Sequence, residues 1–127
     1  MNILLDTHAI WWFLNGNEKL PKTAKEAIVN MDNTIFISMA TIWEVAIKMS
    51  IGKLEFDGGI DGFIKAIVDN DFMLLEIDVE HIKATVDLPL IHRDPFDRMI
   101  IAQAMVEDVP VMTTDENVLK YDITVIW

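Results

Sequence analysis

Acidic side chains recur where apolar runs of the sequence end or helical patterns begin. Asp6 follows the apolar run NILL, Asp115 follows PVMTT, and Asp94 and Asp97 lie at the start of a helical pattern. Glu44 lies inside the otherwise apolar stretch ATIWEVAI. Oxygen ligands without cysteine or histidine suit Mg²⁺ or Mn²⁺, and one or two such ions would activate water and stabilise the leaving oxygen in phosphodiester cleavage. These five acids are therefore candidate metal ligands.

Each of these acids also has an ordinary structural explanation. Asp6 and Asp115 fit the N-cap position of a helix, and Asp94 fits it because a proline follows at the first helical position. Thr41 and Glu44 have the spacing of a capping box in a helix that begins at Thr41. Taken one at a time, the acids do not distinguish a cap from a metal ligand.

The only two arginines of the chain surround the aspartate pair. Arg93 and Asp97, and likewise Asp94 and Arg98, are four residues apart, which is the spacing of ion pairs on a helix. A guanidinium beside a metal site can instead hold a substrate phosphate through two hydrogen bonds. Both explanations of the arginines stay open at the level of the sequence.

Short apolar runs alternate with helical patterns along the whole chain. The runs predict strands over residues 2–5, 34–38, 73–77, 110–113 and 123–126. The spacing of apolar residues between them predicts helices over 7–14, 22–31, 39–50, 60–70, 79–86, 95–107 and 116–121. Continuously apolar strands separated by helices indicate an α/β fold with three layers, in which helices cover both faces of a mostly parallel sheet.

A parallel sheet would bring the acids together. Helix N-termini gather at the carboxyl edge of such a sheet, where ligands of open α/β folds usually bind, and each of the five acids maps to that edge. Separate helices have no structural need to collect carboxylates, because the like charges repel and raise some of the pKa values. A divalent cation would remove that cost.

Length and composition predict one compact domain over residues 1–127, with a core of its own. The chain has no cysteine, so disulfides and thiolate metal sites are excluded. The N-terminal apolar run lacks a basic segment and is interrupted by Asp6, so it predicts neither a signal peptide nor a membrane span. We expect a cytoplasmic protein.

The net charge of −11 is unevenly distributed, since the first 56 residues carry only −1 of it. Such a chain should repel a polyanion, because nucleic-acid affinity normally comes from lysine and arginine. Binding of RNA would therefore need a special reason, and divalent cations at the acidic cluster, which present positive charge once bound, would supply one. A basic protein partner is the other kind of molecule that this charge favours.

Four segments of the sequence, in this order and spacing, resemble the PIN-domain family and in particular its VapC-like toxin ribonucleases. They are LLDTHA, SMATIWEVAIK, HRDPFDRMIIAQA and TTDENV, which together span nearly the whole chain. The resemblance implies an endoribonuclease that depends on Mg²⁺ or Mn²⁺. It also implies the toxin of a toxin–antitoxin pair, neutralised by a small antitoxin protein whose basic tail enters the acidic site, and a possible homodimer.

The resemblance further implies which residues bind the metal. The four implied ligands are Asp6, Glu44, Asp97 and Asp115. Asp94 is left as an N-cap or a supporting residue. Thr7 and Thr113 are the hydroxyl neighbours of the first and fourth acids. Of these assignments, the fourth acid is the position that varies in the family.

Two other functions fit parts of the sequence. A phosphoaspartyl hydrolase of similar architecture would use Asp6 as its nucleophile, but His8 stands where the D-x-D motif of that group requires a second aspartate. The second is a catalytically silent module that only binds a partner or RNA, and no residue contradicts it. Among the remaining polar and aromatic residues, His92 could orient an acid or touch RNA, whereas Trp11, Trp12 and Trp43 lie in apolar helical runs that predict core positions.

Overall fold

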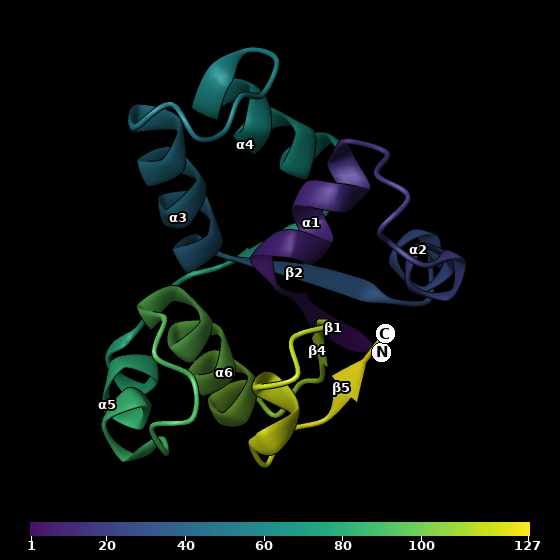
Figure 1. Ribbon diagram of the computed structural model, residues 1–127. Helices are drawn as coiled ribbons and strands as arrows, with labels where there is room; N and C mark the ends of the chain where they lie inside the picture. The colour runs from purple at the N-terminus through teal and green to yellow at the C-terminus, as the bar shows by residue number, and fades with distance from the viewer.

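The computed structural model describes residues 1–127 and contains a five-stranded sheet with the order β3-β2-β1-β4-β5 (Figure 1). All neighbouring strands are parallel. The strands are β1 (Asn2–Leu5), β2 (Thr34–Ser38), β3 (Met73–Leu75), β4 (Val111–Met112) and β5 (Val125–Ile126). The helices are α1 (Thr7–Leu14), α2 (Lys22–Val29), α3 (Met39–Ser50), α4 (Gly59–Asp69), α5 (Val79–Asp87) and α6 (Pro95–Glu107), followed by a 3₁₀ turn, η1 (Val118–Lys120).

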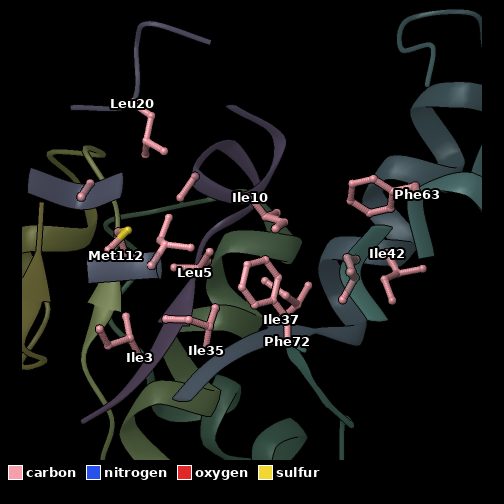
Figure 2. Close-up of a cluster of buried hydrophobic side chains, with 14 of the residues drawn as sticks. Ile3, Leu5, Ile10, Leu20, Ile35, Ile37, Ile42, Phe63, Phe72 and Met112 are labelled. Carbon is pink, nitrogen blue, oxygen red and sulfur yellow. The ribbon is translucent and has the colours of Figure 1, made fainter. Parts of the chain in front are cut away.

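The sheet separates two layers of helices, as Figure 1 shows: α1 to α4 lie on one side and α6 lies on the other, with α5 packed along α6. Alternation of side chains along β1 explains this arrangement, because successive residues of a strand point to opposite faces. Ile3 and Leu5 join the large cluster under α1 to α4 that Figure 2 shows, whereas Leu4 packs against Ile100 and Ala104 of α6. The predicted three-layer α/β fold is confirmed.

Two local predictions are wrong. The helix predicted over 116–121 is only the single 3₁₀ turn η1. The predicted capping box of Thr41 and Glu44 is absent, because α3 begins at Met39 and Ser38 caps it by accepting a hydrogen bond from the backbone N–H of Ala40 at 3.0 Å. A helix that begins directly at the end of β2 places Glu44 inside α3, where its side chain is free for another role.

The parallel arrangement defines one edge at which β1, β2 and β4 end. The chain passes directly from β1 into α1 and from β2 into α3, so the first turns of both helices lie at this edge. Residues after β4 reach the same edge, since β4 pairs with β1 in parallel. No helix is long and apolar enough to cross a membrane.

Candidate metal centre

Asp6 is held rigidly between β1 and α1. Its backbone N–H donates to the carbonyl of Met112 at 3.1 Å, and its Oδ1 accepts from the N–H of Ala9 at 2.8 Å as the N-cap of α1. Burial raises the pKa of Asp6, and the nearby charge of Asp115 adds to this, while the hydroxyl of Thr113 and the N–H of Ala9 act in the opposite direction. The predicted N-cap is confirmed.

Glu44 is the acid with an unsatisfied oxygen. It projects from α3, retains only 7% of its exposure, and its Oε2 accepts a hydrogen bond from Nζ of Lys48 at 2.8 Å. Its Oε1 is buried and has no hydrogen-bond partner. Leaving a buried charged oxygen without a partner is costly, so a position of this kind indicates a missing ligand such as a cation.

Asp94 and Asp97 have different roles at the start of α6. Oδ1 of Asp94 accepts hydrogen bonds from the N–H groups of Phe96 at 2.9 Å and Asp97 at 3.1 Å, so Asp94 is the predicted N-cap. The carboxylate of Asp97 makes no such cap. Burial and the charges of Asp94, Glu44 and Asp6 together raise the pKa of Asp97 to about 7, against the lowering effect of His92. These interactions place Asp97, Glu44 and Asp6 in one acidic region.

His92 joins Asp115 to this region. Its Nε2 lies 2.7 Å from Oδ2 of Asp115 and 3.2 Å from Oδ2 of Asp97. Its Nδ1 accepts from the N–H of Asp94 at 3.2 Å, so Nε2 carries the proton that bridges the two carboxylates. Although partial burial raises it, the pKa of Asp115 is lowered overall by the hydrogen bond from His92 and by that from the N–H of Asn117. His92 thus orients two acids, one of the two roles that the sequence left open for it.

The two threonines differ in their contacts. The hydroxyl of Thr113 accepts from the N–H of Asp115 at 3.0 Å and also interacts with Asp6, so it links the first and fourth acids. The hydroxyl of Thr7 lies 3.1 Å from that of Thr41 and is buried. Thr7 therefore ties α1 to α3 and contacts none of the acids.

The arginine pairs expected from the sequence are absent. Neither Arg93 nor Arg98 forms an ion pair with an acid. Arg98 instead donates four hydrogen bonds of 2.9 to 3.3 Å to main-chain carbonyls, which belong to Thr85, Leu88, Pro89 and His92. Both of its Nη atoms hold the loop between α5 and α6, which favours the structural explanation of Arg98.

The core positions predicted for three tryptophans are only partly correct. Trp11 and Trp12 pack against the core, as predicted. Trp43 does not, because 63% of its surface is exposed and its ring contacts Phe96 edge-on, with centroids 5.3 Å apart. The apolar run around Trp43 predicted the helix correctly but did not show which of its faces meets the core.

The arrangement has the properties of a cation site built from oxygen ligands. Ligand atoms of His92, Asp97 and Asp115 all lie within 4.8 Å of one another, and the charges of Glu44 and Asp6 act on Asp97. Carboxylates that raise one another's pKa values, together with the unpartnered Oε1 of Glu44, fit a hard divalent cation. A second cluster consists of Asp78, His81 and Glu107: Asp78 and His81 form the capping box of α5, and Nε2 of His81 lies 2.9 Å from Oε1 of Glu107.

Comparisons with known proteins identify the family and the fold. A family model described as PIN domain matches residues 3–123. The fold is similar to that of VapBC2 from Rickettsia felis bound to a DNA fragment from their promoter, with 14% identity, a TM-score of 0.76, and coverage of 99% of this chain and 98% of that chain. VapBC-1 from nontypeable Haemophilus influenzae gives 16% identity, a TM-score of 0.72, and coverage of 99% and 97%. DNA-bound VapBC from Salmonella typhimurium gives 17% identity, a TM-score of 0.71 and the same coverage. No curated protein matches in sequence.

Proposed function

Because this chain belongs to the PIN domain family, we propose that it is an endoribonuclease that depends on Mg²⁺ or Mn²⁺ and cleaves RNA phosphodiesters with water as the nucleophile. The observation that carries the proposal is the buried Oε1 of Glu44, which has no partner within an acidic cluster.

Asp6, Glu44, Asp97 and Asp115 would hold the ion or ions. When bound, Mg²⁺ or Mn²⁺ supplies positive charge to the phosphate oxygens and lowers the pKa of the attacking water. Asp97 has to lose its proton before it can serve as a ligand, because burial and its acidic neighbours raise its pKa to about 7.

Three supporting contacts would keep the ligands in place. His92 fixes the orientation of Asp115, and Thr113 connects that residue with Asp6. Asp94 caps α6 and so positions the turn that carries Asp97. None of these supporting residues has to act as a nucleophile.

We also propose that the chain is the toxin of a toxin–antitoxin pair and acts in the cytoplasm. Its fold is that of chains in VapBC structures, although their low identity to this chain supports only the fold. The net charge of −11 favours a basic antitoxin segment as the inhibitor, because opposite charges speed association and add affinity at moderate salt. An antitoxin complex whose affinity does not change with salt would contradict this role of charge.

The test is cleavage of pooled cellular RNA by the purified chain in Mg²⁺ or Mn²⁺. Controls are EDTA, the Asp6→Asn variant, and Asp32→Asn, which removes an exposed acid outside the cluster. Discrete cuts that need the metal, disappear in Asp6→Asn and persist in Asp32→Asn would support the proposal. Cuts that survive Asp6→Asn would contradict it, and a folded protein that binds its partner but neither binds the metal nor cuts RNA would be the silent module.

A further inference from the structure

An open groove of about 620 Å³ lies between α3 and the segment that joins α5 to α6. Its walls include Trp43, Phe96, Leu90, Arg93 and Arg98. None of its ten lining residues is acidic, and both arginines of the chain are among them, although the chain as a whole carries a charge of −11. The groove is thus a local exception to the charge of the molecule.

Two residues of the groove are next in sequence to members of the acidic cluster. Trp43 precedes Glu44 on α3, and Phe96 precedes Asp97 in the first turn of α6. When a phosphodiester of an RNA chain lies at those carboxylates, the adjacent nucleotide has to lie to one side of this edge of the sheet. Trp43, Phe96 and the two arginines lie on one such side.

The chemistry of the walls fits a nucleotide. Trp43 is 63% exposed, and its edge-on contact with Phe96 holds the ring in a defined position while leaving part of its surface open. Aromatic side chains of this kind stack on unpaired bases of any sequence. The exposed guanidinium of Arg93 forms no ion pair, so it is free to meet an adjacent phosphate.

Resting on the proposed ribonuclease function, we infer that this groove binds the nucleobase next to the scissile phosphate, with Trp43 as the stacking surface and Arg93 as the phosphate contact. The substrate class is then unpaired RNA, because a base inside a duplex is already stacked and cannot enter the groove. Arg98 contributes its charge to the wall and keeps its hydrogen bonds to the loop.

The test is the affinity for a fluorescein-labelled single-stranded RNA of mixed sequence, measured by anisotropy in Ca²⁺, an oxygen-ligand cation that can occupy the acidic cluster, with a gel to confirm that the RNA stays uncut. Trp43→Ala should weaken binding about tenfold, whereas Trp43→Phe should stay close to the unmodified chain. Arg93→Gln should weaken binding several-fold and lower the slope of log affinity against log salt by about 0.7. Ile51→Ala is the matched control, since Ile51 is 60% exposed at the end of α3 and does not line the groove.

The outcomes separate the two proposals. RNA binding that depends on Trp43 without any cleavage in Mg²⁺ or Mn²⁺ would support the groove and overturn the nuclease. Three outcomes would overturn the groove. They are equal affinities of Trp43→Ala and Ile51→Ala, no RNA binding by the unmodified chain, and an affinity for duplex RNA equal to that for single-stranded RNA. If Trp43→Ala keeps its RNA affinity but changes the mass measured by light scattering, the groove binds a protein, and the inference is wrong.

Discussion

Nε2 of His92 donates a hydrogen bond to Oδ2 of Asp115 at 2.7 Å, across the gap between the segment before α6 and the segment after β4. The N–H of Asp94 fixes the ring by donating to its other nitrogen. His92 therefore has one defined tautomer and one defined direction. A contact of this kind would orient Asp115 as a proposed metal ligand, in the way that outer residues of metal sites commonly do.

We predict that His92→Ala weakens Mn²⁺ binding by about 10- to 100-fold while the chain stays folded, because Asp115 loses its orienting donor. Isothermal titration of Mn²⁺ into the metal-free protein measures the effect. His92→Gln is the matched variant, since its amide can still donate to a carboxylate, and it should retain part of the affinity. Equal affinities of the unmodified chain and His92→Ala would exclude a positioning role.

A second prediction separates the cap of α6 from the proposed ligand. Asp94→Ala should lower the free energy of unfolding by about 1 kcal/mol, because two N–H groups lose their acceptor. Asp94→Asn should keep the cap. Asp97→Asn should lose metal binding without lowering the stability of the metal-free protein. Urea unfolding and metal titration of the three variants check this, and a strong loss of metal binding in Asp94→Asn would reverse the assignment.

The sequence predicted the gathering of the acids because parallel topology alone decides it. Once β1, β2 and β4 are parallel, the residues that follow them have to share an edge, and the positions of Asp6, Glu44 and Asp115 along the chain are sufficient. Exact side-chain contacts were not needed for this inference.

The path of the segment between α5 and α6 could not be predicted in the same way. That path depends on long-range contacts, such as the hydroxyl of Tyr121, which accepts from the N–H of His92 at 2.8 Å and donates to the carbonyl of Pro89 at 2.6 Å. Spacing within HRDPFDR suggested helical ion pairs, but the loop before α6 offers Arg98 carbonyl acceptors instead. Local spacing carries no information about such acceptors.

The pKa of Asp97 predicts how stability varies with pH in the absence of metal. The folded value of about 7 exceeds the ordinary 3.8, so between these pH values the folded state holds more protons than the unfolded state. Stability from this group is therefore fully present at low pH and is lost as pH rises toward 7. Relative to the unmodified chain, Asp97→Asn should gain stability between pH 4 and pH 7, measured by urea unfolding in EDTA.

The control for this pH prediction is Asp32→Asn, which removes an exposed acid. Its difference from the unmodified chain should change less with pH than that of Asp97→Asn. Affinity for Mg²⁺ should rise over the same range, since the ion requires the deprotonated carboxylate. A difference between Asp97→Asn and the unmodified chain that stays constant from pH 4 to pH 8 would show that Asp97 titrates normally.

The unpartnered Oε1 of Glu44 gives a further prediction. Glu44→Gln should weaken Mn²⁺ binding by about tenfold or more, because a neutral amide replaces a proposed carboxylate ligand. Glu26→Gln is a matched control, since Glu26 also pairs with a lysine four residues away but lies exposed on α2. If both substitutions leave Mn²⁺ affinity unchanged, Oε1 of Glu44 does not face the ion.

Arg98 should prove to be a structural residue. Its four hydrogen bonds to carbonyls hold the loop that carries His92 beside the acids. Arg98→Met leaves those carbonyls without their charged donor, and hydrogen bonds to charged groups each contribute about 1.5–3 kcal/mol, so the variant should unfold at clearly lower urea concentration. Arg93→Met, which removes a guanidinium without ion pairs, should change stability by less than about 0.5 kcal/mol. A fully stable Arg98→Met variant would show that the loop keeps its path without these bonds, and His92 would then owe its position to Tyr121 and Asp94 alone.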